Sequence, residues 1–347
     1  MTRKLLTGKG AQYNPPNSFQ KNQVDWEAEE AYERAKPPTK VYHEYPRQIL
    51  SKNNSPDLHF DYSVNPYQGC EHGCSYCYAR TTHEYWGFSA GLDFESQIMV
   101  KFNAPDLLKK QLSNSKWKGE LIMFSGNTDC YQPLEKKYEL TRKLLSVCLD
   151  HRQAINIITK NHLIQRDMDL LREMSALQLV AVCLSITSLD ESLRRVMEPR
   201  TSTASKRIET VKLLADAGIP VSVNIAPVIP YLNLHELPEL IECCFNAGAY
   251  DVNYATVRLN GVVGDVFRDW LKTHFPDRSE KVWNAVGKLH GGAVSEHQFG
   301  KRMKGEGTEA QMISQLFHKA KNKYFPVIKK PKIDHTIYRR STQPTLF

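Results

Sequence analysis

Short apolar runs alternate with longer amphipathic runs between about residue 63 and residue 260. The apolar runs predict strands at 120–127, 154–160, 179–187, 219–229 and 250–258. Apolar residues at helical spacing predict helices between them, at 133–151, 163–177, 205–218 and 233–249. Gly218 and Gly248 stand where two of these helices should end. A repeated strand-helix order is typical of a parallel sheet with right-handed crossovers.

The two faces of the predicted strands differ in polarity. One face of 180–187 carries Val180, Val182, Leu184 and Ile186, and the other carries Ala181, Cys183, Ser185 and Thr187. Ser222, Asn224 and Ala226 share one face of 221–226, and Asn156 and Lys160 share one face of 154–160. A flat covered sheet would be apolar on both faces, and a closed eight-stranded barrel would be filled with bulky apolar side chains. We therefore predict an α/β fold with a partial (β/α)6 TIM-type barrel, open at one side, around a polar cavity.

The chain divides into four segments by composition. Residues 1–58 are rich in Pro, Asn, Lys and Tyr and predict an extended N-terminal arm laid over a domain surface. The barrel is expected to occupy 59–260, and helical patterns predict a C-terminal helical region at 261–328. The remaining residues, 329–347, predict a basic disordered tail.

Charge and the absence of long apolar runs bear on partners and location. The net charge is +8, and the segment from residue 301 to the C-terminus holds 11 Lys or Arg against 3 Asp or Glu. Such a basic segment suits a polyanion such as nucleic acid, although it is also typical of a solvated tail. No signal peptide and no run of about 18 uncharged apolar residues is present. We therefore expect a cytoplasmic protein with no membrane partner.

Three of the eight cysteines are clustered. Cys70, Cys74 and Cys77 have the spacing C-x3-C-x2-C in NPYQGCEHGCSYCYAR, whereas the other five are scattered. Three thiolates from one loop can hold three irons of a [4Fe–4S] cluster and leave the fourth iron open for chemistry. The alternative is a structural zinc site of Cys3His type, with His72 or His83 as the fourth ligand.

The motif C-x3-C-x-aromatic-C, with Tyr76 before the last cysteine, resembles the radical S-adenosylmethionine (SAM) enzymes. The resemblance covers roughly residues 60–260. It implies that SAM binds the unligated iron, and that the reduced cluster cleaves SAM to give a 5′-deoxyadenosyl radical. The cofactors implied are therefore a [4Fe–4S] cluster and S-adenosyl-L-methionine.

A closer resemblance is to spore photoproduct lyases and an uncharacterised group of bacterial relatives. The matching pieces are NPYQGCEHGCSYCYAR, GLDFE, TDCYQPLE, TRKLL, ITKN, SITSLD, MEPR and APVIP. This resemblance implies SAM contacts by Thr128, Asp129, Lys160 and Ser185, with Glu198 and Arg200 of MEPR as further candidates. The strand pattern independently places Lys160 and Ser185 on the cavity side. Asp129 would accept from the SAM ammonium, and Lys160 would pair with its carboxylate.

The chain departs from that group at one position. Spore photoproduct lyases have a hydrogen-donating cysteine two residues before the Ser/Thr–Asp pair, and this chain has Gly126 there. Tyr76 and Tyr78 match the tyrosines near the cluster loop. Cys130 and Cys183 are alternative hydrogen donors or, instead, small buried side chains. Repair of the same lesion by the same route is therefore not expected.

The chain ends in QPTLF, which resembles the peptide by which bacterial DNA-repair and replication proteins bind the sliding clamp. Gln343 would form hydrogen bonds, and Leu346 and Phe347 would fill an apolar pocket. Taken together, the sequence predicts a lyase-like radical SAM enzyme that acts on nucleic acid, as in DNA repair of a lesion or modified base. The alternatives are a radical SAM enzyme acting on a protein or small molecule, and a non-catalytic zinc-stapled nucleic-acid-binding protein.

Overall fold

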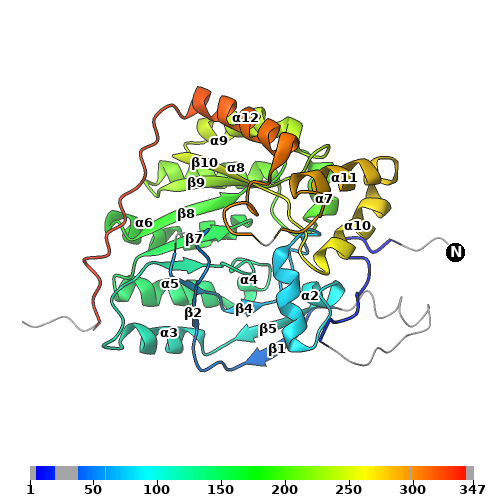
Figure 1. Ribbon diagram of the computed structural model, residues 1–347. Helices are drawn as coiled ribbons and strands as arrows, with labels where there is room; N and C mark the ends of the chain where they lie inside the picture. Colours follow the sequence, from blue (N-terminus) through cyan, green and yellow to red (C-terminus); the bar gives the residue numbers. More distant parts are fainter. Residues whose placement is uncertain (1–4, 20–37, 59, 297, 341–347) are drawn as a thin grey trace, which may run out of the picture.

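Six parallel strands form the main sheet in the part of the chain that the computed structural model describes, residues 5–19, 38–58, 60–296 and 298–340. Their order is β3-β6-β7-β8-β9-β10 (Figure 1). The bounds are β3 (Tyr62–Val64), β6 (Ile122–Phe124), β7 (Ile155–Thr159), β8 (Val180–Ser185), β9 (Val221–Val228) and β10 (Asp251–Thr256). Strand β2 (Leu50–Lys52) extends the sheet antiparallel to β3. The predicted α/β partial barrel is confirmed.

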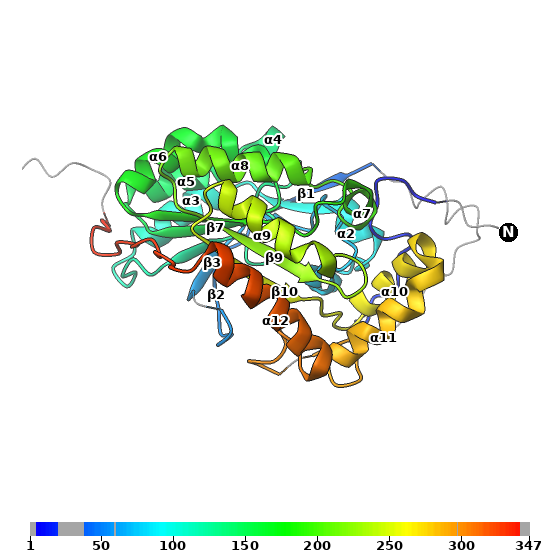
Figure 2. The ribbon, with the colours of Figure 1, turned by 90° about the horizontal axis from the view of Figure 1, so that it is seen from above.

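Helices cover the outer face of this sheet (Figure 2). The longer ones are α3 (Ala104–Leu112), α5 (Leu140–Asp150), α6 (Met168–Ala176), α8 (Ala204–Asp216) and α9 (Leu237–Asn246). Shorter ones are α4 (Glu135–Tyr138), η2 (His162–Asp167), α7 (Glu191–Met197) and η3 (Leu234–Glu236). Asp190 and Thr203 start α7 and α8 by accepting hydrogen bonds from backbone N–H groups of the first turn.

The main core lies between the sheet and these helices. Val182 and Leu184 on β8 and Val223 on β9 are at most 1% exposed. Burying each such side chain contributes about 1.5–3 kcal/mol. The opposite faces of the same strands carry Ser185 and Asn224, which line an internal cavity. The predicted difference between the strand faces is therefore present, and it leaves polar groups at the centre of the barrel.

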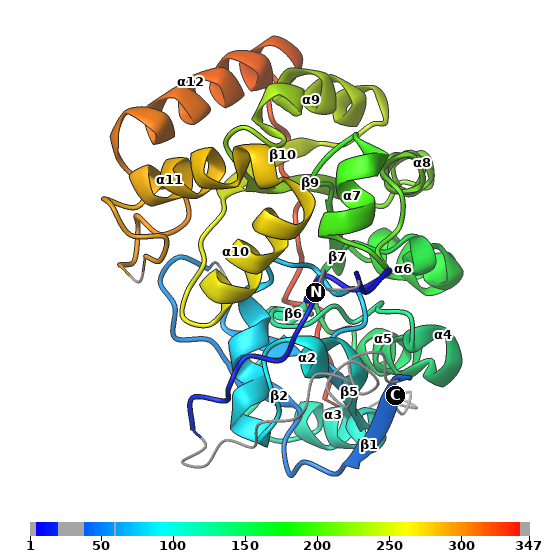
Figure 3. The same cartoon turned by 90° about the vertical axis from the view of Figure 1, so that its right-hand side faces the viewer.

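A second, smaller sheet combines two strands of the crossover between β3 and β6 with one strand from the N-terminal segment. Strand β5 (Gln97–Lys101) pairs in parallel with β1 (Lys40–Glu44) and antiparallel with β4 (Tyr67–Gln68). The same crossover carries η1 (Tyr78–Trp86) and α2 (Leu92–Ser96), and Figure 3 shows β1, β5 and α2 together at one end of the molecule. The segment expected to be an extended arm, 1–58, thus contributes β1 and β2 to two different sheets.

The C-terminal helical layer lies against one edge of the barrel. It comprises α10 (Val263–His274), η4 (Pro276–Arg278), α11 (Ser279–Leu289) and α12 (Gly307–Tyr324). Phe317 of α12 packs on Tyr254 of β10, with ring centroids 4.5 Å apart. Trp270 of α10 is fully buried and donates a hydrogen bond to the carbonyl of Val196, at 2.8 Å. These contacts tie the layer to the edge strand β10 and to α7.

The segment after α12 differs from the predicted disordered tail as far as residue 340. It runs across the ends at which the parallel strands begin, because Asp334 bonds Gln178 before β8 and Arg339 bonds His151 before β7. Ile333, Ile337 and Tyr338 pack against the main core. The tail is basic, but these three apolar residues supply the burial that fixes it. It therefore covers the end of the barrel opposite to the carboxyl ends of the strands (Figure 1).

Two further expectations concern the ends of the chain and membranes. Gln343, Leu346 and Phe347 lie outside the described residues, so the sliding-clamp contact stays a prediction. Among the described residues, none of the helices has the length and apolar character needed to span a bilayer.

Candidate active site

The three clustered cysteines line one cavity at the carboxyl end of the barrel strands. They lie in the loop that leads from β4 to η1, and the cavity has a volume of about 330 Å³. That volume is within the range of about 300–1,000 Å³ typical of small-molecule sites. Thr128, Asp129, Lys160 and Ser185, from the ends of β6, β7 and β8, line the same cavity. The structure thus brings the three cysteines together with four of the expected cofactor contacts.

Two glycines shape the cysteine loop. Gly69 and Gly73 have φ of 80° and 67°, a region that L side chains rarely adopt. A Cβ on Gly73 would lie 2.7 Å from a carboxylate oxygen of Glu95. The N-terminal segment approaches from the other side, since a Cβ on Gly10 would lie 1.7 Å from the carbonyl oxygen of Gly73. The backbone of the loop is therefore held between two other segments.

A buried ion pair between Arg80 and Glu95 supports the cysteine loop. Arg80 and Glu95 are essentially inaccessible to solvent, and their closest nitrogen and oxygen atoms are 2.6 Å apart. Arg80 also donates to the carbonyl of Cys74, and Glu95 accepts from the backbone N–H groups of Gly10 and Ala11. The pair therefore joins the cysteine loop, α2 and the N-terminal segment.

Arg200 takes part in the same scaffold and does not line the cavity. It donates to Glu71 at 3.0 Å, and its backbone N–H donates to the carbonyl of His72. Gln132 bridges the other side of the loop by accepting from the N–H of Glu71 and donating to the carbonyl of Gly69. The geometry thus places Arg200 behind the cysteine loop, where it can orient the loop but does not face a cofactor in the cavity.

Asp129 is the most strongly held of the cavity residues. It accepts from the Thr159 hydroxyl at 2.7 Å and from the backbone N–H of Lys160 at 2.8 Å, and His72 lies 3.4 Å away. Burial favours the protonated acid, but His72 and these hydrogen bonds outweigh it and lower the pKa of Asp129. Asp129 is therefore an anion that faces the cavity, as binding of an ammonium group requires.

The remaining expected cofactor contacts have different surroundings. The hydroxyl of Thr128 donates to the carbonyl of Tyr67 and accepts from Asn65, so it mainly fixes the turn after β6. The ammonium of Lys160 lies 5.9 Å from the centre of the Tyr76 ring, and Lys160 has no carboxylate partner among the ion pairs of the described residues. Lys160 is thus available to pair with a carboxylate of a ligand.

Tyr76 belongs to a buried network around Glu198. The Tyr76 hydroxyl bonds to Glu198, Thr187 donates to the same carboxylate at 2.7 Å, and Arg207 pairs with it at 2.6 Å. Burial opposes ionisation of Glu198, but Arg207 and Lys160 lower its pKa to about 2. Glu198 does not line the cavity, so the network positions Tyr76 rather than presenting Glu198 to a ligand.

The two alternative hydrogen donors do not line the cavity. Cys130 is fully buried within the main core, and its backbone N–H donates to the Ser125 hydroxyl. Cys183 lies on the inner face of β8, two residues before Ser185. Tyr78, by contrast, lines the cavity together with Gly126. Of the four residues expected to act in catalysis, the structure therefore brings Tyr76 and Tyr78 to the cavity.

Several cavity residues escaped the sequence prediction. The strand pattern predicts one shared face for Asn224 and Ala226 but no role for either residue, and both line the cavity. Arg258 and Met303 also line it, and no sequence motif indicates this. Met303 reaches the cavity because its carbonyl accepts a hydrogen bond from the N–H of Thr256 at the end of β10. Only the folded C-terminal segment brings it there.

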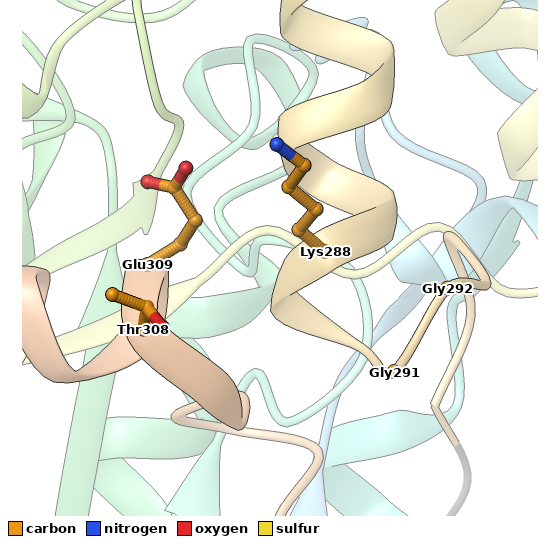
Figure 4. Close-up of a pocket in the computed structure, with 5 residues that line it drawn as sticks. All are labelled: Lys288, Gly291, Gly292, Thr308 and Glu309. Carbon is orange, nitrogen blue, oxygen red and sulfur yellow. The ribbon is translucent and has the colours of Figure 1, made fainter.

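A second hollow lies between α11 and α12 and holds none of these residues. Lys288, Gly291, Gly292, Thr308 and Glu309 line it, as Figure 4 shows. Its volume is about 490 Å³. Because it lacks the cysteines and the polar strand ends, the cysteine-lined cavity is the candidate active site.

The donor set fits an iron–sulfur cluster better than a single zinc ion. Burial and the adjacent Cys70 raise the pKa of the Cys77 thiol to about 11, so three adjacent thiolates require cations to hold them. In the described part of the chain, no group of three or more His, Cys, Asp or Glu side chains has the geometry for one metal ion. A [4Fe–4S] cluster does not need that geometry, because each cysteine binds a different iron.

The two histidines proposed as zinc ligands differ in position, because His72 lines the cavity beside Cys70 and His83 does not. His72 lies between Asp129 and Asn161, and its two ring nitrogens face those residues. His83 packs between Phe88 and Phe94, and burial lowers its pKa to about 4. His83 does not line the cavity. Within the described part of the chain, no side chain completes a four-ligand zinc site with the three cysteines.

Residues 64–244 match the family model of the radical SAM superfamily. That segment is more than half of the chain and contains the cysteine loop and the four parallel barrel strands β6, β7, β8 and β9. The chain belongs to the radical SAM superfamily. Its cofactors are a [4Fe–4S] cluster and S-adenosylmethionine.

Relatives of this chain occur in bacteria and archaea. An uncharacterised protein of Mycobacterium tuberculosis is 34% identical over 226 residues, which are 65% of this chain and 66% of that protein. The chain thus spans just under two thirds of that relative. An uncharacterised protein of Methanocaldococcus jannaschii is 32% identical over 226 residues, which are 64% of this chain and 80% of that protein.

The fold is similar to that of spore photoproduct lyase. The structure of that enzyme with a dinucleoside spore photoproduct covers 88% of this chain and 86% of its own, with a TM-score of 0.63 and 17% identity. A variant structure with bound SAM and the same photoproduct covers 91% and 88%, again with a TM-score of 0.63 and 17% identity. At this identity the likeness shows the fold.

Proposed function

We propose that this protein is a radical SAM enzyme that acts on nucleic acid, with a damaged or modified base as the reacting group. The observation that carries the proposal is the single cavity that joins the three cysteines, the anion Asp129 and the cations Lys160 and Arg258. Spore photoproduct lyase, which has a similar fold, has been solved with a dinucleoside photoproduct. That likeness supports a substrate of the same class.

The residues around the cavity would have different roles in binding the cofactors and the substrate. Cys70, Cys74 and Cys77 would hold the cluster, whereas Asp129 and Lys160 would bind the SAM ammonium and carboxylate. The bound cofactors supply a 5′-deoxyadenosyl radical. Ser185 and Asn224 line the wall above the sheet, and Met303 covers part of the cavity. Their contribution is to orient the reactants and to exclude water from them.

The route by which a substrate radical receives its hydrogen differs from the thiol route of spore photoproduct lyases. Gly126 occupies the position of the donor cysteine, and Cys130 and Cys183 do not line the cavity. Tyr78 is a cavity residue beside that position, since its hydroxyl donates to the carbonyl of Gly126 at 2.7 Å. We therefore do not extend the reaction of that enzyme to this chain.

The basic segment after α12 gives little support to the proposal of a nucleic-acid substrate. Residues 329–340 lie at the opposite end of the barrel from the cavity, so Lys329, Lys330 and Arg339 cannot reach a substrate held near the cysteines in this arrangement. The case for nucleic acid therefore rests on the cavity and on the similar fold.

The test is substrate dependence of SAM cleavage by the loaded protein. We would measure 5′-deoxyadenosine formation under anaerobic, reducing conditions with single-stranded DNA, with RNA, and with a mixture of peptides. The proposal predicts that a nucleic acid accelerates cleavage above the rate without substrate. Acceleration by peptides alone would favour the alternative, a radical SAM enzyme that modifies a protein.

A further inference from the structure

Arg258 is a cation that lines the cavity, and Asp57, the acid whose charge acts on it, is paired with another residue. Arg258 follows β10 and lines the cavity together with Tyr78. Asp57, whose charge acts on Arg258, pairs with Arg302 at 2.5 Å and accepts from the N–H of Gly300 at 2.7 Å. No ion pair joins Arg258 to a carboxylate within the described ranges of the chain.

Buried arginines elsewhere in the molecule are neutralised. Arg80 pairs with Glu95 and Arg207 pairs with Glu198, each at 2.6 Å. A half-buried cation without such a partner loses hydration without a compensating charge. Burial and the nearby Arg302 accordingly lower the pKa of Arg258. The surroundings of Arg258 therefore favour binding of an anion from outside the chain.

Tyr78 fixes where that anion would bind. The carbon atom of the Arg258 guanidinium lies 5.7 Å from the centre of the Tyr78 ring, within reach of a cation–π interaction. The Tyr78 hydroxyl is anchored to the carbonyl of Gly126, and 48% of Tyr78 is exposed. A guanidinium held over an aromatic ring keeps N–H donors free along its edge, which suits two oxygens of one phosphate.

The order of the strands separates this position from the cofactor contacts. Asp129, Lys160 and Ser185 stand at the ends of β6, β7 and β8, in the middle of the sheet. Arg258 follows β10, which is the edge strand at the open side of the partial barrel. An anion at Arg258 therefore belongs to a molecule that enters through the opening, rather than to SAM.

We propose that Arg258, held against Tyr78, binds a backbone phosphate of the nucleic acid and so positions the reacting nucleotide in the cavity. The inference rests on the proposed function, because the phosphate is taken to be that of the substrate. It names a specific contact, however, and can fail while the proposed function stands.

The experiment measures binding of a fluorescent single-stranded oligonucleotide of about 12 nucleotides to the cluster-loaded full chain at several salt concentrations. Arg258→Gln should weaken binding about tenfold and reduce the slope of log affinity against log salt by about 0.7, the value for one phosphate of a single strand. Arg258→Lys should keep most of the slope, because it keeps the charge. Arg172→Gln, on the exposed face of α6, is the matched control and should keep both values.

The outcomes separate the two proposals. Wild-type protein that binds no oligonucleotide but binds a glutamate-rich peptide would overturn the proposed function and this inference together. Wild-type binding that Arg258→Gln leaves unchanged in affinity and slope would overturn this inference alone. Weaker SAM binding by Arg258→Gln, with an unchanged oligonucleotide slope, would assign Arg258 to the cofactor and also overturn it. Iron content and thermal unfolding are measured on every variant, so that a misfolded protein is recognised.

Discussion

The hydroxyl of Tyr78 donates a hydrogen bond of 2.7 Å to the carbonyl of Gly126. The bond joins the element that follows the cysteine loop to the turn that follows β6, across the cavity. Gly126 has φ of 75°, and a Cβ there would lie 3.1 Å from the Cβ of Ser63. A side chain at this position is therefore disfavoured both by backbone strain and by crowding.

We expect Gly126→Ala to destabilise the protein by about 1–3 kcal/mol, because an L side chain is forced into a left-handed conformation. The control is Gly218→Ala, which has φ of 71° but no atom within 4 Å of the added Cβ. Chemical denaturation should show the larger loss at Gly126. Equal losses at both sites would mean that contact with Ser63 adds nothing.

Glu95→Gln should remove the partner of a buried cation. Breaking a buried ion pair from one side costs about 3–5 kcal/mol, and here it also weakens the two N–H contacts to Gly10 and Ala11. We expect lower thermal stability and a lower iron content after reconstitution. Asp216→Asn breaks an exposed pair with Lys212 and should cost less than about 1 kcal/mol. A cluster-loaded Glu95→Gln with wild-type stability would contradict the scaffold described for the cysteine loop.

The Glu198 network predicts a pH-dependent stability difference. The pKa of Glu198 is lowered from its ordinary value of 4.5 to about 2 in the folded protein. A lowered folded-state pKa stabilises the fold above the ordinary value, and this stabilisation is lost as the pH falls through about 2. The stability gap between wild type and Glu198→Gln should therefore be widest near neutral pH and should shrink below about pH 4.5.

Denaturation of both proteins across this pH range measures the gap. Glu242→Gln, at an exposed position on α9, serves as the control and should show a small difference at every pH. A gap for Glu198→Gln that stayed constant down to the lowest pH would argue against the ionised Glu198–Arg207 pair.

Tyr338→Ala should destabilise the barrel although it lies far from the cavity. Tyr338 packs against the main core, covers Gly119 and donates a hydrogen bond to the carbonyl of Leu112. Loss of this partly buried side chain should cost about 1–2 kcal/mol. His335→Ala, at an exposed position of the same segment, should be nearly neutral. No effect of Tyr338→Ala would restore the prediction of a disordered tail from residue 329.

Periodicity was sufficient to predict the barrel because each strand buries one apolar face under helices. The same alternation placed Lys160 and Ser185 at the cavity, and the cysteine spacing located the cluster loop. The pairing of β1 with β5 was not predictable, since the two strands are far apart in sequence and β1 carries no alternation that specifies a partner. The proposed role of Arg258 was not predictable either. It depends on the lack of an ion pair to Arg258 among the described residues, and only the folded structure shows this.

The segment after α12 shows that composition alone can suggest too little structure. Its basic composition suggested solvation, but Ile333, Ile337 and Tyr338 pack against the main core. Three apolar side chains can fix a segment when a surface already exists to receive them, and composition alone does not reveal that surface. The expected contact of Arg200 with SAM stays a prediction, since MEPR lies near the cysteine loop but Arg200 pairs with Glu71 and is not among the cavity-lining residues.

The most direct test of this account is anaerobic reconstitution followed by assays of iron, sulfide and 5′-deoxyadenosine formed from SAM under reduction, with Cys74→Ala as the control. The account predicts about four irons per chain and 5′-deoxyadenosine that disappears in the variant. Stoichiometric zinc in place of iron, with no SAM cleavage, would contradict the assignment of Cys70, Cys74 and Cys77 to a radical SAM cluster.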